Sequence, residues 1–288
     1  DLDRKVASYL GSERWWKRAD GDVRLPNGAD MTVRHLMTHT SGVVRYEFKQ
    51  EFYKELAKDP LRTWTPEQRL AFILDGTPPF AAGQGWEYSD TNYIILGMIL
   101  EKITGRPLYD EVQRRILAPN NLRNTIPSDR ITLPNVSQGY AGPNNPFGGA
   151  DAMIANGRFT VNPQLEWTGG GFASTAEDLA RWGKLVYEGG IFGEEMLKQA
   201  INGVEAPALG RGTKYGLGVI VRDTPLGISY GHSGFFPGYL TELRYYPQHR
   251  FAVAVQFNTS VQRSIGRNPG AVLQDIASIV AQTLESAR

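Results

Sequence analysis

The last third of the chain carries four consecutive strand patterns joined by short links, and this feature limits the possible folds more than any other. The strands are predicted over residues 215–221, 228–232, 239–246 and 251–258. Consecutive strands with links this short must pair antiparallel. An amphipathic pattern from Pro269 to about Ser286 then predicts a helix that covers one face of the sheet. We therefore expect an α+β fold with most of its sheet near the C-terminus.

The part of the chain before these strands is mainly helical in pattern. Helices are predicted over residues 31–39, 65–73, 89–104 and 175–187. A proline follows Thr65 in the first turn of the second helix, and Ser89 or Asp90 caps the third. The third helix is apolar on nearly every side, which predicts that it is deeply buried. Ser174 or Thr175 is expected to cap the fourth helix.

Composition excludes several classes of function. The 288 residues include 31 basic and 30 acidic side chains, so nothing favours a nucleic acid or an anionic membrane as partner. No apolar run is long enough to cross a bilayer. The absence of cysteine rules out disulfides, thiolate catalysis and cysteine-bound zinc. A cysteine-free chain suits bacterial exported proteins, and we expect a periplasmic or secreted location.

The first candidate site is Tyr88-Ser89-Asp90, at the start of the third predicted helix. Unpaired N–H groups and the positive end of the helix dipole lie at such a position, and they favour a phenolate. Tyr88 could then take a proton from a serine. The alternative is a capping turn that contains a partly buried tyrosine.

The second candidate site is Gly231-His232-Ser233-Gly234-Phe235, expected at the end of one strand and in the turn to the next. Small residues let a substrate approach the backbone, and exposed edge N–H groups there could hold an oxyanion. The alternative is a glycine-rich turn with a hydrogen-bonded histidine. A hydrolase that uses Ser233 in a G-x-S-x-G elbow is a rival interpretation, but the last glycine is missing and a strand rather than a helix is expected next.

Two further patterns have structural explanations as well as functional ones. Trp167 precedes three glycines and could form a pocket wall with Phe172, but close backbone packing before a capped helix is the preferred explanation of the glycines. His35 and His39 have a spacing that could bind a metal ion, but H-E-x-x-H is not present and no third ligand is evident. Structural histidines are the preferred interpretation, and no metal site is predicted.

Together these segments resemble the superfamily of class C β-lactamases, D-alanyl-D-alanine carboxypeptidases and esterases. Four stretches match in order along nearly the whole chain. They are the helix and turn at 32–42, Tyr88-Ser89-Asp90 as a form of Y-x-N, the helix entry at 170–179, and His232-Ser233-Gly234 as H-x-G. The resemblance implies a mostly helical domain over residues 1–165, residues 166–288 as the C-terminal part of an α/β domain, and a site between them.

The resemblance also implies acyl transfer through a serine and lysine of an S-x-x-K motif. Tyr88 would relay the proton, the backbone N–H of Phe235 would help bind the oxyanion, and His232 would bind or polarise the substrate. Asp90, Ser233, Gly234 and Trp167 would contact an ester, amide or D-amino-acid peptide. No metal or organic cofactor is needed.

The chain itself contains no S-x-x-K, because none of its lysines has a serine three positions earlier. We expect an N-terminal segment of the same protein to supply the motif, and its removal to leave a gap in the core and an unpaired sheet edge. The alternative is a non-catalytic binding protein of the same fold.

Two departures from the family pattern bear on substrate choice. Asp90 stands where asparagine is usual, and an ionised carboxylate cannot donate to a substrate carbonyl. We therefore expect Asp90 to pair with the lysine or to cap the helix instead. His232 stands where β-lactamases carry lysine, and a neutral histidine attracts a carboxylate less. Both favour an esterase or D-amino-acid peptidase, with weak β-lactam hydrolysis as a secondary activity.

Overall fold

The computed structural model, which describes residues 1–143, 145, 147 and 151–287, is built on a six-stranded antiparallel sheet. The strands lie in the order β10-β9-β8-β7-β6-β5. Their bounds are β5 Val204–Glu205, β6 Lys214–Tyr215, β7 Ile220–Thr224, β8 Gly227–Phe236, β9 Tyr239–Tyr246 and β10 Phe251–Phe257. The predicted antiparallel meander is confirmed.

Two details of the predicted strands were wrong. The first predicted strand is interrupted by a bend at Leu217-Gly218, where the positive φ of Gly218 (+76°) turns the chain between β6 and β7. The stretch from Ser233 to Phe235 is part of a strand and not a turn. The reason is that β8 stays paired with β9 as far as Phe236, which faces Tyr239.

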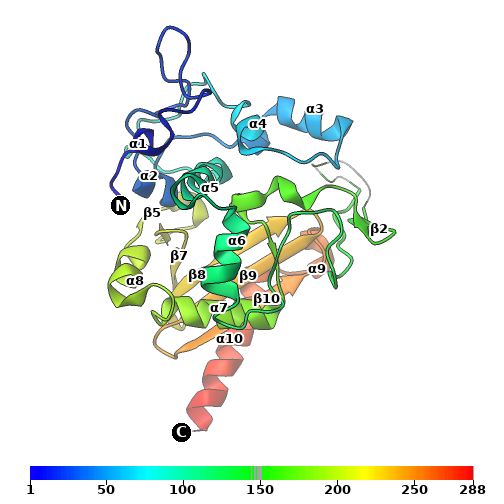
Figure 1. Cartoon of the computed structure of the whole chain (residues 1–288). Coiled ribbons are helices and arrows are strands. Elements are labelled where there is room, and N and C mark those ends of the chain that lie inside the picture. Colours follow the sequence, from blue (N-terminus) through cyan, green and yellow to red (C-terminus); the bar gives the residue numbers. More distant parts are fainter. Residues whose placement is uncertain (144, 146, 148–150, 288) are drawn as a thin grey trace.

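Two helices cover opposite faces of the sheet (Figure 1). Helix α7 (Ala176–Tyr187), whose N-terminal cap is Thr175, brings Gly183 against Leu243 of β9. Helix α10 (Pro269–Ser286) places Gln274 within hydrogen-bond distance of Tyr246, also on β9. Successive residues of a strand point to opposite faces, so positions 243 and 246 lie on different sides of the sheet.

The remaining helices and short strands complete the fold. The helices are α1 Ala7–Leu10, α2 Val33–Met37, α3 Gln50–Lys58, α4 Pro66–Leu70, α5 Asp90–Thr104, α6 Leu108–Val112, α8 Gly193–Ile201 and α9 Gln262–Ile265. Two small ribbons pair β1 Ile126–Pro127 with β4 Phe172–Ala173, and β2 Ile154–Ala155 with β3 Arg158–Phe159. Helices α1 to α5 gather beyond one end of the sheet (Figure 1), around a core that includes Trp16, Phe52 and Trp64.

Helix α5 is less buried than its sequence predicts. Ile94 and Ile95 are fully buried, but Leu100 is 47% and Ile103 60% exposed. Both line an apolar groove of about 470 Å³ that runs along α5. No described residue covers this face, so part of the apolar surface of α5 stays exposed in the described part of the chain.

No helix in the described part of the chain is long and apolar enough to cross a membrane. The proposed division near residue 165 stays a prediction.

Candidate active site

The two predicted motifs meet in space. Tyr88, which lies two residues before α5, and His232, on β8, have ring centroids 6.0 Å apart. Tyr215 of β6 lies beside both, with its ring 6.1 Å from that of Tyr88. The fold therefore gathers a tyrosine from a helix entry and a histidine from a sheet strand into one cluster.

His232 has both ring nitrogens engaged. Its Nδ1 lies 2.6 Å from the carbonyl oxygen of Ser233, which can only accept, so Nδ1 carries the proton. Nε2 then accepts from the Tyr215 hydroxyl at 2.9 Å. Burial lowers the pKa of His232, so the ring is neutral near pH 7. Neither nitrogen is directed at the Ser233 hydroxyl, which weakens the hypothesis that Ser233 is a nucleophile.

The strand that carries His232 offers a free backbone edge. Strand β7 pairs with β8 only as far as Gly231, whereas β9 pairs with it through Phe236. Ser233, Gly234 and Phe235 are exposed beyond that point. Backbone groups that lack a strand partner among the described residues can accept an extended peptide or hold a carbonyl oxygen.

Tyr88 is a phenol in this environment. Burial raises its pKa well above the ordinary value, and nearby Asp90 acts in the same direction. Arg45 opposes this with its guanidinium carbon 5.4 Å from the ring centroid. The helix N-terminus and Arg45 are therefore insufficient to produce a phenolate, and proton transfer through Tyr88 would need a further cation beside it.

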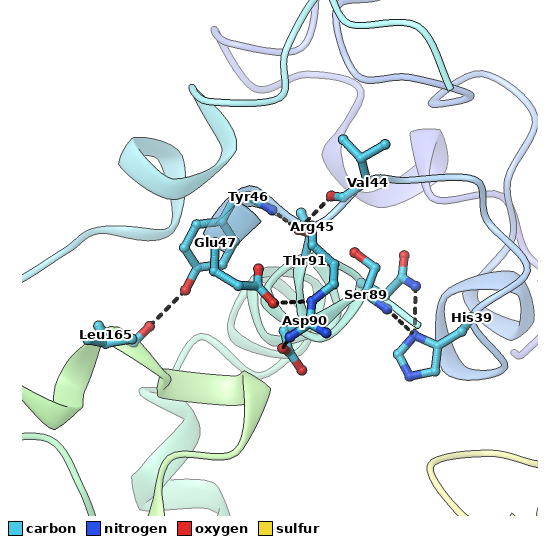
Figure 2. Close-up of polar contacts among 10 residues, drawn as sticks. His39, Val44, Arg45, Tyr46, Glu47, Ser89, Asp90, Thr91 and Leu165 are labelled. Carbon is cyan, nitrogen blue, oxygen red and sulfur yellow. Dashed lines mark hydrogen bonds and ion pairs between the residues drawn. The ribbon is translucent and has the colours of Figure 1, made fainter. Parts of the chain in front are cut away.

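Asp90 is held by Arg45, which sequence reasoning missed (Figure 2). Arg45 donates to Asp90 Oδ2 at 2.8 Å and to Glu47 Oε1 at 2.6 Å. Glu47 is buried, and both burial and the neighbouring Asp90 raise its pKa, so it holds a proton near neutrality. Ser89 occupies the N-cap position of α5 and Asp90 is the first helical residue. Ser89 and not Asp90 is thus the cap, and among the described residues the partner of Asp90 is Arg45. Pairing of Asp90 with the lysine of the S-x-x-K motif stays a prediction.

His39 and His35 have separate structural roles. His35 Nδ1 accepts from the backbone N–H of Thr32 in a capping box at the start of α2. The fully buried His39 instead accepts at Nδ1 from the N–H of Ser89 (Figure 2). Among the described residues, no group of three or more His, Asp or Glu side chains is placed to hold a metal ion.

Trp167 lies against α5, where it lines the apolar groove and is 7% exposed. A side-chain carbon at Gly97 would come within 2.8 Å of its ring. The same turn passes close to the first residue of the helix, because a methyl group at Gly169 would lie 3.3 Å from Asp90 Cβ. A contact between Trp167 and substrate stays a prediction.

Sequence patterns gave no signal for Tyr215 or Arg45. Tyr215 looks like an ordinary strand residue, and its partnership with His232 depends on how β6, β7 and β8 align. Arg45 lies in an irregular stretch between α2 and α3.

Comparisons with known proteins show the family of the chain. A sequence model of the Beta-lactamase family matches residues 1–275. Penicillin-binding protein 4* of Bacillus subtilis (strain 168) is 26% identical over 232 residues, which cover 76% of this chain and 49% of that protein. Esterase EstB of Burkholderia gladioli is 27% identical over 269 residues, which cover 81% of this chain and 67% of the esterase. The chain thus spans about half the length of the Bacillus relative.

A solved D-stereospecific amidohydrolase from Streptomyces sp. has a similar structure. It superimposes with a TM-score of 0.76 at 28% identity, over 90% of this chain and 75% of that one.

Proposed function

The chain belongs to the β-lactamase family of hydrolases, and from this premise we propose that it is the larger part of a serine hydrolase that forms an acyl-enzyme on esters, amides or D-amino-acid peptides. The observation that carries the proposal is the approach of Tyr88 and His232, with ring centroids 6.0 Å apart, next to the free edge of β8. A proton carrier and a neutral hydrogen-bonding group beside an exposed backbone edge are what acyl transfer needs.

The roles follow from the positions. The substrate lies along the edge at Ser233 to Phe235, and the N–H of Phe235 stabilises the oxyanion of the tetrahedral intermediate. A serine attacks the carbonyl carbon, its proton passes by way of Tyr88 to the leaving group, and water later hydrolyses the ester. His232 contacts the substrate as a neutral group. The loss of one oxyanion donor typically costs about 3 kcal/mol of transition-state stabilisation.

The serine and its lysine come, in this proposal, from a segment outside these 288 residues. The apolar groove along α5 supports the idea, because a helix seated there would cover Leu100 and Ile103. Asp1 and Leu2 line the same groove, which places it next to the start of the described chain. Strand β10 ends the sheet with no further strand beside it among the described residues. A lysine from that segment would be the cation that a buried Tyr88 needs.

The carboxylate of Asp90 is a reason to favour esters and D-amino-acid amides over β-lactams as the substrates. Its carboxylate is already engaged by Arg45 at 2.8 Å and offers no N–H to a substrate carbonyl. The names of the relatives, an esterase and a D-stereospecific amidohydrolase, agree with this preference. A periplasmic or secreted location remains part of the proposal.

The test is an intact mass measurement after incubation with a fluorophosphonate. The protein isolated from its natural host is compared with the 288-residue chain produced alone. We expect one adduct on the isolated protein, at a serine outside these residues, and none on the 288-residue chain. An adduct that disappears in Ser233→Ala would establish Ser233 as the nucleophile, and no adduct on either sample would favour the non-catalytic binding protein.

A further inference from the structure

His39 packs against Tyr88 and belongs to a buried chain of hydrogen bonds, here called the relay. In each bond of this relay the donor and the acceptor can be assigned. The Ser41 hydroxyl accepts from the backbone N–H of Val43 at 3.0 Å and donates to Asn92 Oδ1 at 2.6 Å. The amide nitrogen of Asn92 therefore faces His39 Nδ1, at 3.0 Å. The N–H of Ser89 reaches the same nitrogen at 3.1 Å.

Two donors on one nitrogen fix the tautomer of the ring. Nδ1 of His39 must offer a lone pair, so the ring proton is on Nε2. Burial lowers the pKa of His39 to about 3, which keeps the ring neutral over the whole physiological range. The relay is therefore permanent and does not titrate near pH 7.

The residue held by this relay is Tyr88. His39 accepts from Ser89 through its ring and from the N–H of Glu87 through its backbone carbonyl, at 3.1 Å in each case. These are the two residues that flank Tyr88. The ring of His39 also lies against that of Tyr88, with centroids 4.2 Å apart and planes tilted by 36°. Backbone and ring of His39 thus make three contacts, one with Tyr88 itself and one with each of its two neighbours in the chain.

His39 holds this position in a left-handed backbone conformation, with φ of +59°. A non-glycine residue adopts this conformation at a cost, and asparagine tolerates it better than most residues. Such strain is kept where the surrounding structure demands it, often at a functional site. The positive φ of His39 agrees with a role of the turn at 39–42 in the position of Tyr88.

We propose that His39 is a positioning residue for Tyr88, which fixes the phenol for proton transfer through the lone pair on Nδ1. The proposal rests on the proposed acyl transfer. A packing role alone would require the shape of the ring, whereas positioning requires an acceptor at Nδ1.

Two substitutions separate these roles. In His39→Asn the side-chain oxygen stands near the position of Nδ1, accepts from Ser89, and tolerates the positive φ. In His39→Leu the volume remains but the acceptor is lost. We expect His39→Asn to keep kcat within about threefold, and His39→Leu to lower kcat about 100-fold with KM within about twofold, as expected when a reacting group is misplaced by about 1 Å. Both variants are made in the protein of the natural host, which would carry the nucleophile, and the probes are 4-nitrophenyl acetate and D-alanine 4-nitroanilide.

A second measurement, by NMR, does not depend on activity. Long-range ¹H–¹⁵N correlation spectra of the histidine rings should place the His39 proton on Nε2, unchanged from pH 8 to pH 5. The ring signals of ¹³C-labelled Tyr88 should keep their shifts in His39→Asn and change in His39→Leu.

Equal kcat losses in the two variants, an unchanged kcat in His39→Leu, or a proton on Nδ1 would overturn the proposal. If the unmodified protein from its natural host, which would carry the nucleophile, turns over neither probe, the proposed function has failed. The tautomer and the Tyr88 spectra then decide the role of His39 by themselves.

Discussion

The hydroxyl of Tyr215 lies 2.9 Å from Nε2 of His232, while Nδ1 of the same ring lies 2.6 Å from the carbonyl oxygen of Ser233. The imidazole is thus held between a donor on one side and an acceptor on the other. This arrangement sets its tautomer, while burial lowers its pKa and keeps it neutral. The tautomer of His232 therefore depends on Tyr215, a tyrosine outside the family motifs.

The first prediction removes that donor with Tyr215→Phe. The neutral form of His232 then loses the hydrogen bond at Nε2, so its pKa should rise, and the protonated fraction at pH 6 should increase. We expect kcat/KM to fall by about tenfold, the size of one typical hydrogen bond. NMR titration of His232 together with the pH–rate profile measures both effects. A lowered pKa would contradict this assignment of donor and acceptor.

The second prediction concerns Glu47 and the pH dependence of stability. Burial and Asp90 raise the pKa of Glu47 in the folded chain above its ordinary value of 4.5. The unfolded chain therefore releases this proton first as the pH rises, and the free energy of unfolding should fall above about pH 4.5. One proton contributes a slope of at most about 1.4 kcal/mol per pH unit. Glu47→Gln should remove this part of the slope.

The matched control for Glu47 is Glu51→Gln, at an exposed position on α3. Urea unfolding at several pH values measures the slope for each variant. A wild-type slope that survives in Glu47→Gln would mean that Glu47 is already ionised beside Arg45.

The third prediction contrasts two glycines of β8. A methyl group at Gly231 would lie 1.8 Å from the carbonyl oxygen of Leu243, so Gly231→Ala must force β8 and β9 apart. A methyl group at Gly234 meets only Thr241, at 3.3 Å. We expect Gly231→Ala to destabilise the chain by about 3 kcal/mol and Gly234→Ala by less than about 1 kcal/mol. Thermal unfolding measures both, and equal losses would contradict the strand register.

Sequence patterns predicted elements whose signals are local. The strand Tyr239–Tyr246 is rich in aromatic and apolar residues between clear turns, and α10 begins at Pro269 after a side-chain cap from Asn268. Both were found with the predicted bounds. The split between β6 and β7 was missed because it depends on the backbone conformation at Gly218. The composition of residues 215–221 is typical of one continuous strand and gives no sign of this bend.

The site was predictable only in part, for a related reason. Tyr88 and His232 belong to recognisable motifs, but the partners that set their protonation come from elsewhere in the fold. Tyr215 depends on strand register, and Arg45 on the course of an irregular stretch. The burial of α5 could not be judged from its own residues, because burial depends on what packs against the helix.

The last prediction tests what the groove along α5 receives. Leu100 and Ile103 are exposed apolar residues that line it, so replacing both by glutamine should hardly affect the 288-residue chain. We expect its free energy of unfolding to change by less than about 0.5 kcal/mol, since glutamine has a similar helix propensity. If a segment that carries the nucleophile packs there, the same double variant should slow fluorophosphonate labelling of the protein from its natural host by at least about tenfold. Met196→Gln on α8, which is 38% exposed and outside the groove, is the control. Labelling at the wild-type rate would show that the nucleophile approaches Tyr88 from another direction.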